Sequence, residues 1–165
     1  MKKILFIAIT LLPFMATAQD CQIKKETDQF TREPRLSTGF IPLQFSTLAI
    51  DADKKDFDFF FTHEGPDKCF DDQSTVVVMF EGSKQRNTFR NSGSMNCEGL
   101  FHFTVRNGPE TPFAVKRFAT IKVAQFIFTV NNNKKPITLT LTPTQQQTLM
   151  QAAGCIATEA QALVK

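Results

Sequence analysis

The densest group of side chains that could bind a metal ion or transfer a proton begins at His63 and Glu64. Asp67, Asp71 and Asp72 follow, where a predicted strand ends and a loop begins. Imidazole and carboxylate groups are ligands of zinc, and loops at strand ends are common places for sites. The helical H-E-x-x-H zinc motif needs a second histidine, which this segment lacks. We expect an acidic loop without a catalytic role. The alternative is a small hydrolase or metal-binding protein centred on His63, Glu64 and Asp67.

A second group of carboxylates, Asp51, Asp53, Asp56 and Asp58, suggests a calcium loop. The EF-hand loop requires glycine at its sixth position and glutamate at its twelfth. Counted from Asp51, those positions hold Asp56 and Thr62, so the calcium motif fails. The sequence instead predicts a solvated hairpin loop, whose charges also discourage pairing between sheet edges.

The material for nucleophilic catalysis is sparse. The sequence has no G-x-S-x-G nucleophile elbow and no glycine-rich phosphate loop. His102 could act as a base, but it stands alone within a predicted strand. A pair of carboxylates that meet in space, as in glycosidases, stays open because sequence separation does not fix their distance. We expect no catalytic residue, no metal and no cofactor, and we favour a non-catalytic protein over an enzyme.

The N-terminus has the three parts of a cleaved export signal. A short positive start precedes a mainly apolar stretch over residues 4–14, and small residues at 16–18 provide a cleavage site. The apolar stretch is too short for a stable transmembrane helix, which needs roughly 20 apolar residues. We predict a signal peptide over residues 1–18 and a single mature domain over 19–165. This domain would reside in the periplasm or be secreted, and would not span a membrane after cleavage.

Charge balance and aromatic content argue against two classes of partner. The chain has 19 Lys and Arg against 16 Asp and Glu, and two of the lysines belong to the predicted signal, so the mature domain is close to neutral. A nucleic-acid-binding domain would show a basic face, whereas these basic residues are scattered. There are 18 Phe but no Trp or Tyr. Because Phe has no polar group, most of its rings are expected in the core, and sugar binding is disfavoured.

One hairpin can be placed by its turn. Residues 75–80 form an apolar run that predicts a central strand covered on both faces. A Gly-Ser turn then reverses the chain, and residues 84–90 return as the partner strand. With the turn centred on this Gly-Ser pair, Thr75 faces Arg90.

The register of this hairpin also predicts how the cysteines pair. Four cysteines in an exported chain indicate two disulfides, and the absence of C-x-x-C spacing disfavours a zinc site. Extending the ladder outward brings Cys69 opposite residue 96, one position from Cys97, an offset that a bulge absorbs. We predict a Cys69–Cys97 disulfide and, by elimination, a Cys21–Cys155 disulfide that ties the N-terminus to the C-terminal segment.

The rest of the chain is mainly β until a final helix. Alternation places Phe57, Phe59 and Phe61 on one face of a strand. Other strands are expected at residues 45–50, 100–105, 121–130 and 137–142. Thr111 and Pro112 predict the cap and first residue of a short helix.

The C-terminal segment changes to helical spacing. Residues 142–145 read Thr-Pro-Thr-Gln, which matches a capping box, and an apolar stripe with helical period follows. The sequence therefore predicts an α+β, mainly β domain. It would be an antiparallel sheet of about 6–8 strands with a C-terminal helix packed on it and two disulfides.

Several features in this order resemble a group of small uncharacterised exported proteins of Gram-negative bacteria. Asp28, Phe30 and Thr31 form a D-x-F-T opening, and a Glu-Gly turn, a long strand, a final strand and a cysteine-containing helix follow. The resemblance implies a location in the cell envelope and one sheet-plus-helix domain, without any activity. We expect the D-x-F-T segment to be structural, with Phe30 packed under the N-terminal disulfide.

These observations favour a non-catalytic exported module that binds an envelope protein or another apolar partner. A Phe-rich sheet held by disulfides, without a catalytic set, supports this prediction. A carrier whose Phe rings line a cavity for an apolar ligand is a further alternative to the hydrolase or metal-binding protein.

Overall fold

The computed structural model describes residues 21–29, 31–66, 68–130 and 135–164. The predicted signal peptide, Phe30 and Asp67 lie outside these residues. Within them, ten strands form two antiparallel sheets, accompanied by two helices and two disulfides. The predicted mainly β class with a C-terminal helix is therefore confirmed, with the strands divided between two sheets.

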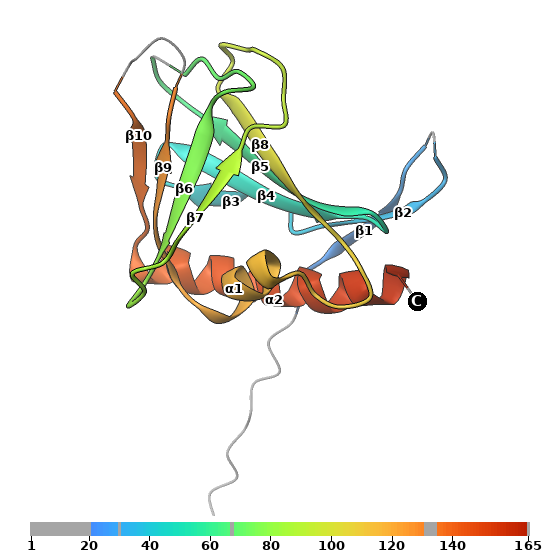
Figure 1. Ribbon diagram of the computed structural model, residues 1–165. Coiled ribbons are helices and arrows are strands. Elements are labelled where there is room, and N and C mark those ends of the chain that lie inside the picture. The colour runs from blue at the N-terminus through green and yellow to red at the C-terminus, as the bar shows by residue number, and fades with distance from the viewer. Residues whose placement is uncertain (1–20, 30, 67, 131–134, 165) are drawn as a thin grey trace, which may run out of the picture.

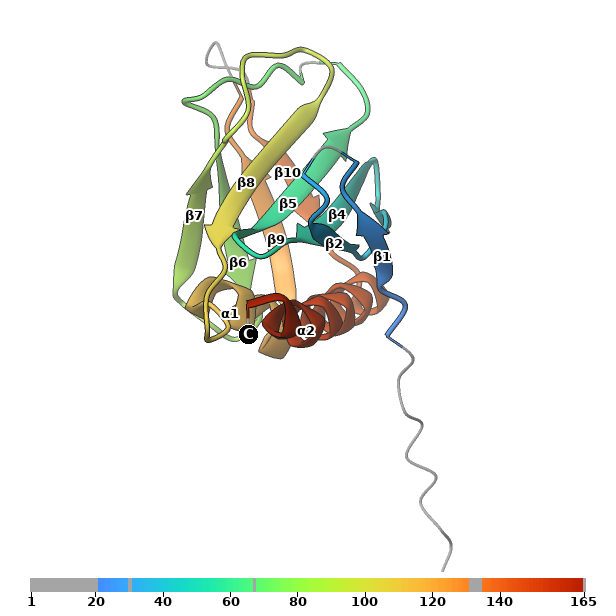
Figure 2. The same cartoon turned by 90° about the vertical axis from the view of Figure 1, so that its right-hand side faces the viewer.

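The larger sheet has the strand order β1-β2-β4-β5-β8, and β3 pairs with β4. Its strands are β1 (Lys24–Thr27), β2 (Pro34–Ser37), β3 (Ile41–Leu43), β4 (Ser46–Ala52), β5 (Asp56–His63) and β8 (Leu100–Arg106). The smaller sheet, in the order β10-β9-β6-β7, contains β6 (Thr75–Phe80), β7 (Arg86–Arg90), β9 (Val123–Phe128) and β10 (Ile137–Thr140). The helices α1 (Phe113–Thr120) and α2 (Pro143–Val164) lie together at one end of the strands (Figures 1 and 2).

The hydrophobic core lies between the two sheets. Phe57, Phe59 and Phe61 all point inward from β5, as their alternation predicts, and are fully buried. The ring centroid of Phe61 lies 5.1 Å from that of Phe126 and 5.0 Å from that of Phe128, both on β9 of the facing sheet. Edge-to-face packing of this kind adds to the roughly 1.5–3 kcal/mol that burial of each ring contributes.

The hairpin of β6 and β7 has the predicted register, with Thr75 opposite Arg90. The prediction that both faces of β6 are covered is wrong. Val76, Val78 and Phe80 are buried, whereas the alternate residues are half-buried. Both helices lie at the end of the strands rather than over the outer face of the smaller sheet, so that face stays partly open (Figure 1).

Both predicted disulfides are confirmed. Cys69 bonds to Cys97 beside the backbone pair Phe70–Asn96, which is displaced by one residue from the β6–β7 register, as the predicted offset requires. Cys21 bonds to Cys155 across a sequence separation of 134 residues. In the chain-entropy description, closing a loop of that length stabilises the fold by roughly 4–5 kcal/mol.

The two helix starts differ from each other. The predicted capping box of α2 is confirmed, because the backbone N–H of Gln145 donates to Thr142 Oγ1 at 3.3 Å and that of Thr142 donates to Gln145 Oε1 at 3.0 Å. The predicted start of α1 is wrong by one residue. Pro112 has an extended ψ of 143° and is itself the N-cap, so Thr111 lies outside the helix and supplies no cap.

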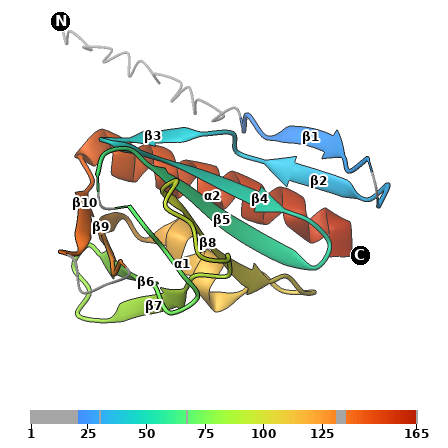
Figure 3. The same ribbon diagram turned by 90° about the horizontal axis from the view of Figure 1, so that it is seen from above.

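β1 and β2 form a hairpin that we call the N-terminal arm. It lies along the side of the larger sheet that is farther from the smaller sheet (Figure 3). Lys25 bonds to Glu159 of α2 at 2.7 Å, and the disulfide of Cys21 attaches the preceding residues to the same helix. Leu36 is buried, but every residue of β1 is exposed. The arm therefore has no apolar alternation from which it could be predicted.

Candidate functional site

His63, the first member of the predicted metal cluster, is part of the core. The residue is 2% exposed at the end of β5, and its ring packs against those of Phe70 and Phe128. Its Nδ1 lies 2.8 Å from Ser46 Oγ. Burial, with a smaller effect from the charge of Lys68, lowers the pKa of His63 from 6.5 to about 4. The ring is therefore neutral at pH 7 and closed off from solvent.

The other described members of this cluster do not join His63. Glu64 and Asp72 are exposed, and Asp67 lies outside the described residues. Asp71 uses its carboxylate locally, accepting hydrogen bonds at 2.9 Å from the hydroxyl and the backbone N–H of Ser74. Within the residues that the structure describes, no group of three or more His, Cys, Asp and Glu side chains is arranged to hold a metal ion.

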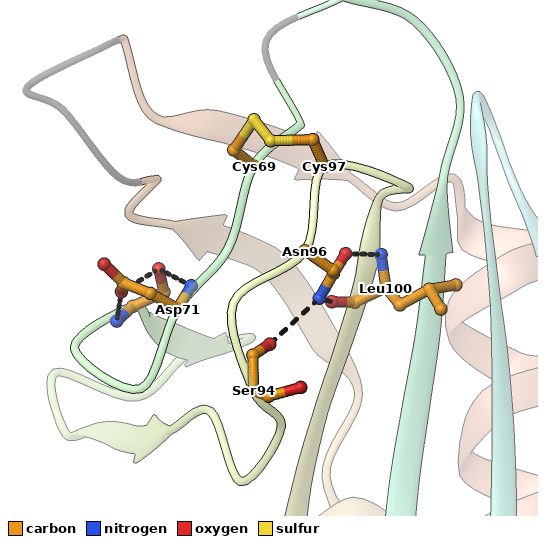
Figure 4. The surroundings of a disulfide bond; sticks show 7 residues. Cys69, Asp71, Ser94, Asn96, Cys97 and Leu100 are labelled. Atoms are coloured by element: carbon orange, nitrogen blue, oxygen red, sulfur yellow. Dashed lines mark hydrogen bonds between the residues drawn. A yellow bond between two sulfur atoms is a disulfide. The ribbon is translucent and has the colours of Figure 1, made fainter.

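The loop after β5 is instead joined by a disulfide to the segment between β7 and β8. Figure 4 shows the Cys69–Cys97 disulfide with Asp71 and Asn96 nearby. Asn96 donates from Nδ2 to the carbonyl of Leu100 at 2.9 Å and accepts from the backbone N–H of the same residue at 3.1 Å. These bonds satisfy backbone groups that no strand partner reaches. Asp71, one of the candidate metal ligands in the sequence, therefore forms hydrogen bonds that shape this loop.

A different group of side chains meets on the outer face of the larger sheet, the face opposite the core. Asp51 of β4 stands directly across from Asp58 of β5. His102 of β8 and Arg35 of β2 lie on either side of this pair, so four strands contribute one residue each. We call Arg35, Asp51, Asp58 and His102 the charged row.

One ion pair and one further hydrogen bond hold the charged row together. Arg35 Nη2 donates to Asp51 Oδ2 at 2.7 Å, and His102 Nδ1 lies 3.1 Å from Asp58 Oδ1. Burial raises the pKa of Asp58, while the hydrogen bond and charge of His102 oppose this rise and the charge of Asp51 adds to it. Asp51 Oδ1 is buried and accepts no hydrogen bond from the described residues. Two carboxylates against one permanently charged guanidinium leave the row with a negative surplus when His102 is neutral.

The charged row borders a hollow of about 450 Å³ between the N-terminal arm and the sheet, which we call the outer-face hollow. Its charged lining residues are Lys24, Glu26, Arg35, Asp51 and Asp58. Phe40 and Phe60 supply aromatic surface, and Phe40 is 67% exposed although it is a large apolar side chain. A pocket that combines apolar surface with a few convergent polar groups is typical of ligand-binding sites.

The arrangement offers binding groups of both charges and one carboxyl with a raised pKa. A carboxyl that holds its proton to higher pH could donate it, as a general acid does. However, each carboxylate already bonds to a basic side chain of the charged row. The geometry is therefore better suited to recognising charged groups than to turning over a substrate.

Three members of the charged row are candidates in the sequence, but in separate groups. Asp51 and Asp58 belong to the failed calcium pattern, and His102 stands alone in a predicted strand. A hairpin is predicted here, but with Asp51 in its loop. That placement is wrong, because β4 continues to Ala52 and sets Asp51 opposite Asp58 within the sheet. Arg35 gave no signal, because the strands of the arm were not predicted.

The apolar interior has a different character. Phe89 and Phe103 stack with ring centroids 4.1 Å apart, and Phe59 lies 4.7 Å from Phe103 on its other side. Phe118 of α1 extends the same cluster to the helical end of the sheets. These rings occupy the space in which an apolar-ligand carrier would hold its ligand.

Comparisons with known proteins give no match to a protein-family model, a curated protein or a solved structure. No helix in the described part of the chain combines the length and apolarity needed to cross a membrane. The two disulfides fit an oxidising environment such as that of exported proteins.

Proposed function

We propose that this chain is a non-catalytic exported module that binds a ligand in the outer-face hollow. The observation that supports this most is the exposed ring of Phe40 at a hollow whose other lining groups include Phe60 and the charged Asp51 and Asp58. The partner expected from the sequence, an envelope protein or an apolar molecule, becomes one that contacts aromatic and charged groups together.

Binding is favoured over catalysis because the two carboxylates of the charged row are engaged by basic side chains. Asp51 is ion-paired to Arg35, and Asp58 is bonded to His102. Such internal pairs hold side chains in fixed positions, which lowers the entropy lost when a ligand binds. We further propose the periplasm or the extracellular medium as the location, since both keep disulfides oxidised.

Site-specific photo-crosslinking tests this proposal in the cells that make the protein. Phe40 is replaced by benzoylphenylalanine, and the matched control carries the same replacement at Phe113, which is 71% exposed on α1 and does not line the outer-face hollow. Intact mass analysis after illumination should give a discrete adduct at position 40 and none at position 113. The absence of an adduct at position 40, or equal adducts at both positions, would contradict the proposal.

A further inference from the structure

We propose that the outer-face hollow recognises a small zwitterion, a molecule with an ammonium group and a carboxylate on one apolar stem, such as a free α-amino acid. This inference rests on the proposed binding function and names the chemical class of its ligand. It is drawn from the distribution of charge around the hollow.

The floor of the hollow suits an ammonium group. Asp51 and Asp58 come from directly opposed positions on β4 and β5, where two like charges destabilise each other unless a cation lies nearby. Arg35 bonds to Asp51 Oδ2, whereas Asp51 Oδ1 is buried and has no donor among the described residues. An ammonium group donates three hydrogen bonds and would neutralise the surplus charge of the two carboxylates.

The arm supplies a positive group for a carboxylate. Lys24 of β1 lines the hollow beside Gly39, together with the carboxylate of Glu26 from the same strand. None of the salt bridges within the described residues uses Lys24. Arg35, by contrast, is already paired with Asp51. Lys24 is therefore the cation available to an incoming carboxylate, on the arm rather than on the sheet.

Apolar surface lies in the same hollow as the charged groups. Phe60, Ala49 and the exposed ring of Phe40 line the same hollow and can contact a hydrocarbon side chain. A volume of about 450 Å³ is within the range of pockets that hold small molecules. A ligand with only one charge would leave either Lys24 or the carboxylate pair without its complement.

The test compares L-leucine with its two singly charged analogues, isoamylamine and isocaproate, by NMR titration of the disulfide-bonded mature chain. We expect leucine to shift the resonances of Phe40, Ala49 and Phe60 with a Kd about tenfold or more below that of either analogue, since each lost ion pair costs on the order of one such factor. Dileucine, in which the two termini are farther apart, distinguishes a free amino acid from a peptide as the source. Binding of dileucine as tight as that of leucine would overturn the amino-acid assignment.

Two variants test which side chains bind the carboxylate and the ammonium group of the ligand. Lys24→Gln should reduce the affinity for leucine to that for isoamylamine, and Asp58→Asn should reduce it to that for isocaproate. The matched controls Lys54→Gln and Asp72→Asn remove exposed charges that do not line the hollow, and should leave leucine binding unchanged. If isoamylamine or isocaproate binds as tightly as leucine, the zwitterion inference fails while the proposed function stands. If no probe shifts these resonances and position 40 gives no crosslink, both fail.

Discussion

The two histidines of this chain lie on neighbouring strands, but their side chains are on opposite faces of the larger sheet. His63 on β5 is 2% exposed, bonded to Ser46 and surrounded by rings, and its pKa is lowered to about 4. His102 on β8 keeps 30% of its side chain exposed and bonds to Asp58. In the sequence, the carboxylates that follow His63 make it the stronger candidate of the two histidines for a metal or catalytic site. In the structure, His102 is instead the histidine whose side chain is accessible to solvent.

The difference between the two faces follows from the period of a β-strand. Successive residues of β5 alternate between the core and the solvent, so Phe61 and His63 point inward while Asp58 and Phe60 point outward. Inward residues contribute mainly packing energy. Outward residues can contact residues of adjacent strands on the solvent side, and it is on this face that we propose ligand recognition.

Replacing one Phe on each face of β5 by Ala should give the largest difference in the free energy of unfolding between two variants. Phe61→Ala should lower the free energy of unfolding by about 3–5 kcal/mol, because it leaves a cavity among Phe101, Phe126 and Phe128. Phe60→Ala should cost only about 1 kcal/mol, because its ring is half-buried on the outer face. Urea denaturation of both variants measures the contrast. Equal losses would mean that the outer face is also part of the core.

The pH dependence of stability should depend on His63. Its pKa is about 4 in the folded chain against 6.5 for the ordinary group. Between these values the unfolded chain binds the extra proton, so the free energy of unfolding decreases as the pH falls from about 6.5 to about 4. The loss should be on the order of 3 kcal/mol and should be complete below pH 4.

Denaturation of the wild type and of His63→Asn across this pH window isolates the effect. Asparagine can keep a hydrogen bond to Ser46 but does not titrate. The free energy of unfolding of the variant should therefore decrease less between pH 6.5 and pH 4 than that of the wild type. His102→Asn is the matched control on the other face and should keep the decrease of the wild type. An unchanged slope in His63→Asn would show that the buried histidine does not control acid sensitivity.

Local rules explain what could be predicted from the sequence. The hairpin through Thr75 and Arg90, the pairing of Cys69 with Cys97 and the capping box at Thr142 each depend on a turn or a cap within a short stretch of chain. Alternation also identified the buried rings of β5. These features are encoded by neighbouring residues, and they hold in the structure.

The candidate site is encoded by longer-range pairing. His102 reaches Asp58 over 44 residues, because β8 pairs with β5 and skips the two strands between them in the sequence. Arg35 comes from the arm, whose exposed β1 has no apolar pattern. The division into two sheets decides which strands become neighbours. The alternation of single strands does not contain that information.

The smallest expected effect is the change in stability of Asp58→Asn, a variant that is also used to test ligand binding. Burial raises the pKa of Asp58, so the folded chain holds this proton to higher pH than the unfolded chain does. The stability that this preference contributes is present below pH 3.8 and is lost as the pH rises through the raised pKa, which leaves ionised Asp58 unfavourable at pH 7. Asp58→Asn removes this cost and keeps an acceptor for His102. Its free energy of unfolding at pH 7 should therefore rise, within about 1 kcal/mol.

Asp51→Asn is the matched comparison, because it weakens the ion pair with Arg35 and should lower stability or leave it unchanged. Thermal unfolding of the two variants at pH 7 decides the order. If Asp58→Asn is the less stable, Asp58 is held for structural reasons and the charged row is no longer a region kept for a ligand. If Asp58→Asn is the more stable, the fold carries this carboxylate at a cost in stability, which is the behaviour expected of a group retained for binding.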